Sequence, residues 1–401
     1  MPIAAVPGYL GQDFTAASPA MRFGIYLKLW GTNSRTNTLR WETYDIDYEV
    51  RGQNQMEREV RKENKVSALR DARRLNDDDK KAMHALLVRQ RQTFETVGAI
   101  NAVFRLDAES VAPFTTGLGN EHPLENGFSF LNPYGLPYLP GSGIKGVLRQ
   151  ATWELASGKW GESCSWNEDD IAALFGLQPK DGDTEHSRGA LIFWDVIPQI
   201  KGDSLMVEIM TPHQNHYYQQ DHTKGMGSTT PHDSGQPMPI SYLTVPPGSG
   251  FTFHVGCDLA LLRRIAPTLA ENNRWEALLT TAFEHAFQWL GFGAKTSVGY
   301  GAMRALSLEE VEQADADAKA ATLHCGWVDE TIKRLTKTHN AKALDVLRGK
   351  PLAEEWRALQ DRSLQVKAFA DIKARWQAQG WWNNPPGKSA KQARVMYEGS
   401  E

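Results

Sequence analysis

Two glycine-rich stretches decide how this chain is interpreted: Gly291-Phe-Gly-Ala-Lys-Thr-Ser-Val-Gly-Tyr-Gly301 and Tyr138-Leu-Pro-Gly-Ser-Gly-Ile-Lys-Gly-Val-Leu-Arg149. The first follows a long apolar pattern of helical spacing, and the second leads directly into one. Glycine permits positive φ angles and close approach of the backbone to a ligand. Successive backbone N–H groups in such turns form anion-binding concavities, and a helix N-terminus adds a favourable dipole. The two loops therefore predict a protein that grips a phosphate backbone.

Neither stretch matches a nucleotide-binding motif. A nucleotide-hydrolysing P-loop places lysine directly after its second glycine and before Ser or Thr. Gly141-Ser-Gly-Ile-Lys-Gly has its lysine between glycines, and Gly293-Ala-Lys-Thr has Ala294 where the second glycine should stand. The dinucleotide fingerprint opens a helix after a strand, whereas Gly291 follows a predicted helix and precedes a predicted strand. Binding of ATP or NAD is therefore disfavoured, and no cofactor is expected.

The composition is that of an ordinary soluble globular protein. The 401 residues are 41% hydrophobic and 23% charged, which suits one large or two moderate domains. The net charge of −4 argues against a free-standing basic nucleic-acid binder but permits a local basic groove within an assembly. No signal peptide or membrane span is expected. The three widely spaced cysteines favour a reducing, cytoplasmic setting over a disulfide framework or zinc ribbon: Cys164, Cys257 and Cys325.

Residues 1–98 form an N-terminal extension with a charged insertion. Residues 23–30 are expected to form a strand. Apolar residues at helical spacing within the charge-dense segment 55–97 predict two exposed amphipathic helices with a break near Asn76. A solvated helix face is the simpler explanation for these charges, and an RNA-facing surface is the alternative.

Residues 99–306 predict an α+β, ferredoxin-like (RRM-like) domain with long insertions. Strands are expected at 99–107, 188–197, 242–245, 250–255 and 300–306, with helices at 144–157 and 259–290 and a break at Pro267. The apolar run at 188–197 is typical of a buried strand. The order strand, helix, strand, strand, helix, strand is that of RNA-recognition folds, although such a fold hosts many functions. Residues 307–401 predict an added helical C-terminal region whose tail from Gly387 is mobile.

The glycine-rich loops supply the first candidate RNA-binding residues. Lys145 and Arg149 lie one helical turn apart, and both can neutralise phosphates. A helix start with a solvent-facing lysine is the alternative. Thr296 and Ser297 can donate to phosphate or to a 2′-OH, and Tyr300 either stacks on a base or enters the core. The candidates from the two loops are Gly141, Ser142, Lys145, Arg149, Gly291, Gly293, Lys295, Thr296, Ser297 and Tyr300.

Residues 211–233 form a loop rich in histidine and tyrosine with three open interpretations. His213, His216 and Tyr217 can stack on splayed bases, the loop can pack on a neighbouring subunit, or its histidines and carboxylates can bind a metal or cleave RNA. The histidine spacing matches no specific metalloenzyme signature, so no metal ligand or catalytic residue is assigned. An RNA endonuclease using these histidines is the alternative function. Asn120 and His122 fit either turn chemistry or RNA contact.

Five segments in order give the chain a family resemblance: Pro7–Phe14, Arg22–Tyr26, Thr116–Gly127, Tyr138–Arg149 and Pro237–Val245. Together with the loop at 291–301, they resemble the RAMP superfamily of CRISPR-associated RNA-binding proteins, in particular the sixth-subunit family of type III-B (Cmr) effector complexes. The resemblance spans roughly residues 1–306 and is poorer over 51–95 and the C-terminal region. It implies a non-catalytic subunit that binds the crRNA 3′ region and complementary target RNA beside other RAMP subunits.

Overall fold

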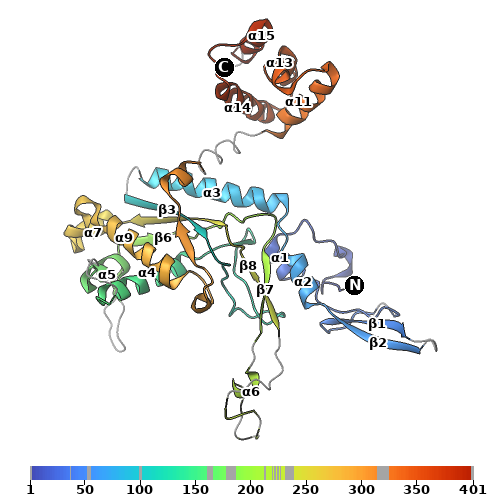
Figure 1. Cartoon of the computed structure of the whole chain (residues 1–401), viewed down its shortest axis with the longest axis vertical. Helices are drawn as coiled ribbons and strands as arrows, with labels where there is room; N and C mark the ends of the chain where they lie inside the picture. The colour runs from blue at the N-terminus through green and yellow to red at the C-terminus, as the bar shows by residue number, and fades with distance from the viewer. Residues whose placement is uncertain are drawn as a thin grey trace. The chain divides into compact units, whose positions relative to one another are not determined.

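The chain divides into two compact units, Met1–Leu306 and Ser307–Glu401, which are treated separately below (Figure 1). The computed structural model describes residues 2–36, 38–51, 56–98, 102–159, 166–177, 187–211, 214–218, 220, 223, 225, 227–230, 239–313 and 325–398. The first unit combines helices and strands, and the described elements of the second unit are helices. Within these ranges, no helix is both long and apolar enough to cross a membrane.

A four-stranded antiparallel sheet organises the first unit. Its strands are β3 (Ala102–Ser110), β6 (Leu191–Phe193), β9 (Gly250–Cys257) and β10 (Met303–Ala305), in the spatial order β10-β3-β9-β6. Helix α4 (Gly141–Ala156) lies between β3 and β6 in the chain, and α9 (Arg274–His285) lies between β9 and β10. The register pairs Leu106 with Phe253 and Met303 with Ser110.

Alternate residues of β9 contact the two layers of helices that cover the sheet. Phe253 packs against Phe283 of α9 and against Phe292, with ring centroids 5.1 and 5.3 Å away. His254 points to the other face, where its ring lies 4.6 Å from that of Phe94 in α3 (Asp77–Gly98). Figure 1 shows α3 along one face, with α4 and α9 on the other. The period of two along the strand therefore builds a three-layered core.

Smaller elements surround this core. The strands form three two-stranded sheets: β1 (Tyr44–Arg51) with β2 (Met56–Glu63), β4 (Phe130–Leu131) with β5 (Leu136–Pro137), and β7 (Met206–Met210) with β8 (Ile240–Thr244). The helices are α1 (Pro19–Phe23), α2 (Lys65–Ala72), α5 (Glu168–Phe175), α6 (Asn215–Tyr218), α7 (Leu259–Ile265) and α8 (Pro267–Ala270). Short 3-10 or π turns occur at η1 (Gly8–Leu10), η2 (Glu271–Asn273), η3 (Ala286–Leu290) and η4 (Thr296–Val298).

Two N-terminal expectations were wrong. Residues 56–63 form strand β2 rather than the start of a helix, and their charges pair across the hairpin, as Glu49 does opposite Arg58. Such opposite-charge pairs stabilise an antiparallel pair of strands. The helical spacing of nearby apolar residues gives no sign of this pairing. Residues 23–30 are no strand, because α1 ends at Phe23 and the chain continues irregularly to an isolated bridge at Trp30. The predicted break near Asn76 does occur, between α2 and α3.

Three further expectations also differ from the structure. Only Leu191–Phe193 of the run 188–197 is a strand, and it is a sheet edge, so Ile192 is 43% exposed rather than buried. Residues 242–244 belong to β8, which pairs with β7 outside the four-stranded sheet. The tail from Gly387 is helix α15 (Gly387–Glu398), because Ala390, Ala393 and Tyr397 give it a buried stripe.

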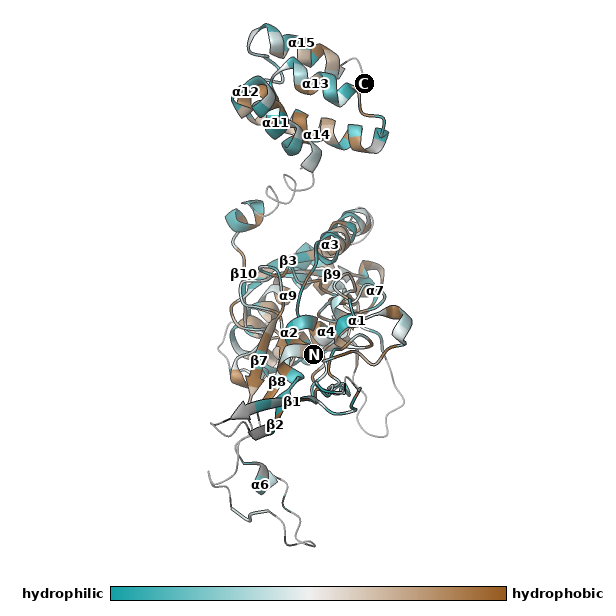
Figure 2. Cartoon of the chain, turned by 90° about the vertical axis from the view of Figure 1, so that its right-hand side faces the viewer, coloured by the Kyte–Doolittle hydropathy of each residue, from teal (hydrophilic) through white to brown (hydrophobic). Residues whose placement is uncertain are grey.

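The second unit is a helical bundle with its own core. It comprises α11 (Gly326–His339), α12 (Ala343–Leu347), α13 (Lys350–Arg357), α14 (Arg362–Ala378) and α15. Trp376 is fully buried, donates its indole N–H to the Leu347 carbonyl at 3.0 Å, and meets Tyr397 edge-on at 5.8 Å. In Figure 2 teal and brown alternate along these helices, as expected of amphipathic segments. Residues 325–398 hold 14 Lys and Arg against 8 Asp and Glu, so the bundle is basic although the whole chain is acidic.

Replacing Trp376 with alanine should unfold the bundle selectively. Deleting a buried Trp side chain costs about 3–5 kcal/mol, and the hydrophobic cluster around Trp376 is separate from that of the first unit. We expect W376A to lower or abolish one thermal transition in calorimetry while a second stays in place. L344A, which removes a side chain that is 55% exposed, is the control and should change little. If W376A shifted every thermal transition by the same amount, the two units would not have separate cores.

His254 should make the first unit less stable in acid. Burial, followed by the like charge of Arg105, lowers the pKa of His254 to about 4. In the unfolded chain this side chain titrates near 6.5. The neutral, buried ring therefore makes its full contribution to the free energy of unfolding above that pH, and this contribution is lost as pH falls from about 6.5 to about 4. The loss is about 1.4 kcal/mol per pH unit within this window. Urea unfolding across this range should show a weaker pH dependence in H254Q, whereas H84Q should retain the parent slope.

Candidate nucleic-acid interface

The Gly291–Gly301 loop is held by close backbone approach to the chain that follows β3. The Gly301 N–H donates to the Pro113 carbonyl at 2.8 Å, and the Ala294 N–H donates to the Thr115 carbonyl at 2.8 Å. A Cβ at Gly301 would lie 1.8 Å from the Phe292 carbonyl oxygen, and φ at this glycine is +70°. A Cβ at Gly293 would lie 2.3 Å from the Thr115 carbonyl oxygen. Only glycine therefore fits these two positions.

Lys295 and Tyr300 connect this loop to the β7–β8 hairpin. Lys295 has the left-handed φ of +61°, and its Nζ lies 2.7 Å from Met210 Sδ and 5.6 Å from the ring centre of Tyr242. The Tyr242 hydroxyl donates to the Tyr300 hydroxyl at 2.8 Å. Burial, followed by that contact, raises the pKa of Tyr242. Thr296 is half-buried and Ser297 is exposed, so the hydroxyl of Ser297 faces solvent beside the lysine.

The second glycine loop begins α4 against the chain that leaves β6. The Gly141 N–H donates to Asp195 Oδ1 at 2.8 Å, so this first amide of the helix already has a carboxylate partner. A Cβ at Gly141 would lie 2.3 Å from the Phe193 carbonyl oxygen, which explains the glycine. Ser142 is exposed at the same helix start.

Lys145 lies within a group of three cations. Burial, followed by the like charges of Arg149 and Arg188, holds its pKa below the usual value for lysine. Arg149 also donates from Nη2 to the Gly176 carbonyl at 2.7 Å, which fixes it beside the end of α5. An anion bound among these three side chains would relieve their mutual repulsion. We therefore treat Lys145, Arg149 and Arg188 as one cation cluster.

Both loops are anchored to the four-stranded sheet, at different positions along its strands. β3 ends at Ser110, where β10 begins at Met303, and the Gly291–Gly301 loop leads directly into β10. Gln199, beyond the end of β6, bridges to Gly250 at the start of β9. Asp195, which holds Gly141, lies in the segment between β6 and this bridge. The sheet thus anchors two loops that are about 150 residues apart in the chain.

Asn120 and His122 occupy a tight turn. The stacked rings of His122 and Phe23 have centroids 3.9 Å apart, and Nε2 of His122 lies 2.7 Å from the Phe23 carbonyl oxygen. Because Nδ1 accepts the Leu124 N–H at 3.2 Å, Nε2 carries the proton and donates it. Burial lowers the pKa of His122, so the neutral ring is favoured. Asn120 is exposed and donates its backbone N–H to the Gly117 carbonyl. His122 thus packs on Phe23 of α1, and the backbone of Asn120 closes a local turn.

Ten of the 23 residues of the 211–233 loop lie outside the described residues, His213, His222 and His232 included. His216 and Tyr217 lie in the short helix α6 between β7 and β8. Tyr217 meets the ring of Tyr218 edge-on at 5.4 Å, and Tyr218 is 78% exposed. Across the residues that the structure covers, no group of three or more metal-ligating side chains occurs.

Sequence reasoning missed three residues that build these sites. Arg188 joins the cation cluster, Asp195 holds Gly141, and Tyr242 underlies Lys295. Each is distant in sequence from the residue that it serves. Arg188 was visible as a cation at the start of a predicted strand, whereas nothing local marks Asp195 or Tyr242.

The chain was then compared with known proteins. The model of the RAMP superfamily matches residues 107–304, a range that holds both glycine loops and the cation cluster. A CRISPR system Cmr subunit, Cmr6 of Pyrococcus furiosus, is 29% identical over 257 residues, which cover 51% of this chain and 67% of that protein. The chain is therefore similar to the RAMP superfamily over residues 107–304 and to Cmr6 over about half of its own length.

Two solved structures are similar to this Cmr6-like chain. The crystal structure of Cmr6 from Pyrococcus furiosus is 26% identical, covers 51% of this chain and 98% of its own, and gives a TM-score of 0.31. The cryo-EM structure of the type III-B Cmr-beta complex bound to cognate target RNA contains a chain that is 18% identical. That match covers 61% of this chain and 71% of that chain, with a TM-score of 0.40.

Two glycines of α4 should respond oppositely to alanine. A Cβ at Gly141 would clash with the Phe193 carbonyl, whereas one at Gly146 would meet no heavy atom within 4 Å. G146A should stabilise the Cmr6-like domain by about 0.5–1 kcal/mol, because alanine is the better helix former. G141A should destabilise it and displace the helix start. Urea unfolding of both variants tests this pair, and equal effects would contradict the close packing of α4 against residue 193.

Proposed function

We propose that this chain is a non-catalytic, RNA-binding RAMP subunit of a type III-B CRISPR effector complex. It binds the crRNA 3′ region and the guide–target RNA duplex beside other RAMP subunits. The match of residues 107–304 to the RAMP superfamily and the similarity to Cmr6 support the assignment to such a complex. The RNA contacts rest on the geometry of the two glycine loops.

The cation cluster at α4 carries the proposal. Burial, and after it the like charges of Arg149 and Arg188, lower the pKa of Lys145, and an anion bound among the three side chains would relieve their mutual repulsion. Phosphates of an RNA strand supply negative charge at regular spacing, and binding them releases counterions. The exposed hydroxyl of Ser142 at the helix start is placed to donate to the same strand.

The Gly291–Gly301 loop extends the proposed RNA path. Ser297 is exposed beside Lys295, whose ammonium group lies against Met210 and Tyr242. Tyr217 and Tyr218 lie in α6, on the connection between the two strands that hold Lys295. Their rings can stack on unpaired bases, which is worth roughly 1–3 kcal/mol per base. We assign the hydroxyl and ammonium groups to the RNA backbone and these rings to bases.

The sheet is assigned to the ferredoxin-like class on its strand order. Counted along the chain, the order is fourth, first, third and second, with α4 after the first strand and α9 after the third. This arrangement supports the RRM-like relationship. We propose that residues 99–306 form the RNA-binding domain, 1–98 an extension that carries the β1–β2 hairpin, and 307–401 a separate helical region.

Alanine at Lys145 should weaken RNA binding in a salt-dependent way. The loss of one phosphate contact should reduce the slope of log K against log salt by about 0.7 for single-stranded RNA. K159A, beyond the other end of α4, removes the same charge from an exposed lysine and is the control. Filter binding of a guide-length RNA across a salt series provides the slopes. A K145A slope equal to that of the parent would reject the phosphate contact, and RNA binding by none of the variants would reject the function.

A further inference from the structure

A second groove with uncompensated positive charge lies away from both glycine loops. It has a volume of about 630 Å³ and lies between α2 and the N-terminal segment. Its cations, Lys28, Arg70 and Arg74, share it with a single carboxylate, Asp71. The other lining residues are Pro2, Ile3, Gln12, Thr32 and Ser67.

The helical period explains how the arginines reach this groove. Ala68, Leu69 and Ala72 bury one face of α2 in the core. Ser67, Arg70 and Asp71 therefore lie on the opposite face, and Arg74 follows one turn after Arg70, just past the helix end. Both arginine side chains are exposed.

The single carboxylate is already engaged by the lysine. Asp71 Oδ2 lies 3.8 Å from Lys28 Nζ, and both side chains are about two-thirds buried or more. Neither guanidinium, of Arg70 or of Arg74, has a hydrogen-bonding or ion-pair partner in the part of the chain that the structure describes. The positive charge of Arg74 also acts on the buried Arg22. The pKa of Arg22 is lowered first by burial and in part by this like charge. The groove thus presents two unneutralised guanidinium forks.

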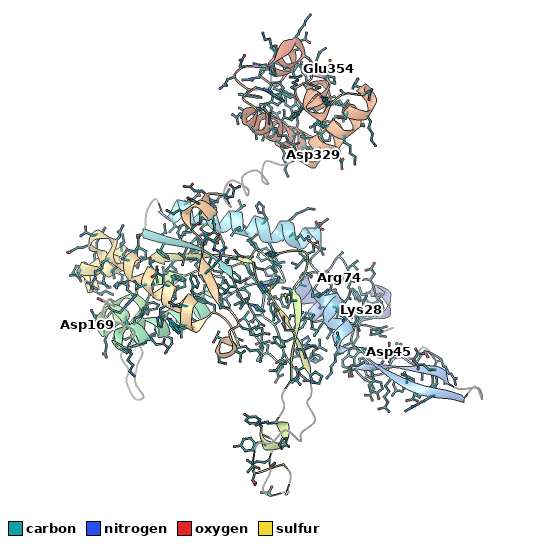
Figure 3. All side chains as sticks on the ribbon, viewed as in Figure 1. Lys28, Asp45, Arg74, Asp169, Asp329 and Glu354 are labelled. Carbon is teal, nitrogen blue, oxygen red and sulfur yellow. The ribbon has the colours of Figure 1, made fainter. Side chains whose placement is uncertain are left out.

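The groove adjoins the β7–β8 hairpin, which contacts Lys295 of the Gly291–Gly301 loop. Arg74 bridges to Ser204, two residues before β7 begins at Met206. The same hairpin contacts Lys295 through Met210 and Tyr242. Figure 3 shows Lys28 and Arg74 near one another beside α2, with β7 and β8 adjacent. A strand that passes Lys295 can therefore reach the arginines across one hairpin.

We propose that Arg70 and Arg74, with Lys28, form a further phosphate-binding site for a nucleic-acid strand. This inference rests on the proposed function, because it lengthens the path of the same RNA. Guanidinium forks bind phosphate oxygens in pairs, and two forks one turn apart can hold one phosphodiester or two neighbouring ones. Ser67 at the groove wall can donate to the same backbone.

A membrane surface or an acidic peptide is less suited to this groove. The two arginines are close together, and the groove offers them a concave site rather than a flat basic face. A free nucleotide shares the phosphate chemistry and must be separated from a strand by experiment. A purely structural role is also testable, because cations in the last turn of a helix stabilise it through the helix dipole.

The test compares R70A/R74A with R263A/R357A in the full chain. Arg263 and Arg357 are exposed and lie in the last turns of α7 and α13, so the control removes equal charge from similar positions. For a guide-length single-stranded RNA, R70A/R74A should reduce the salt slope by about 1.4, as expected for two phosphate contacts. R70K/R74K should recover part of the affinity, since charge returns without the fork.

The outcomes separate this inference from the proposed function. If K145A weakens RNA binding but R70A/R74A matches its control, the arginine site is rejected and the proposed function stands. If R70A/R74A lowers the melting temperature without changing the slope, the arginines are structural and the inference is overturned. Loss of AMP binding with unchanged RNA binding would assign the groove to a free nucleotide instead. Additive losses in the triple variant K145A/R70A/R74A would support two separate contacts with one strand.

Discussion

The close backbone approach between the Gly291–Gly301 loop and residues 113–115 is the constraint on which the rest of the first unit depends. Gly293 allows this approach, because a Cβ there would overlap the Thr115 carbonyl oxygen, and Gly301 allows the loop to fold back on its own Phe292 carbonyl. The approach fixes where β10 begins and so completes the sheet beside β3. It also places Phe292, which is fully buried, among the phenylalanines of β9 and α9. Core packing and the position of Lys295 are therefore set by one contact.

Charge is distributed unevenly, and this reconciles an acidic chain with the RNA binding that we propose. The net charge of −4 opposes long-range attraction of a polyanion, but screening limits that effect to about 8 Å at physiological salt. Within that range a strand meets local groups, such as Lys145 with Arg149 and Arg188. Affinity in such a protein depends on a few well-placed contacts, and the acidic remainder suppresses unspecific binding. An assembly with other subunits suits this balance better than a free-standing binder.

Sequence patterns predicted the elements whose periodicity is strong. The helices at α4 and α9, the strands β3 and β9 and the break at Pro267 all follow from local apolar spacing and proline geometry. Strand β2 did not, because its residues are charged and its stability comes from pairing with β1 rather than from a buried face. The short edge strand β6 was overextended for a similar reason. An apolar run reports burial, and it does not reveal where the partner strand ends.

The candidate site could be predicted in part, because glycine and lysine spacing is local while their partners are not. The glycines that let the backbone pack closely could be recognised in the sequence. The atoms against which Gly293 and Gly141 pack belong to residues 114–115 and 193, which no local pattern marks. His122 shows what a residue type alone leaves open, because its position fitted either turn chemistry or RNA contact. In the structure its ring stacks on Phe23, and two hydrogen bonds to the backbone use both ring nitrogens. A polar residue in a glycine-rich turn must first satisfy its own turn, and only the donors left over are available to a ligand.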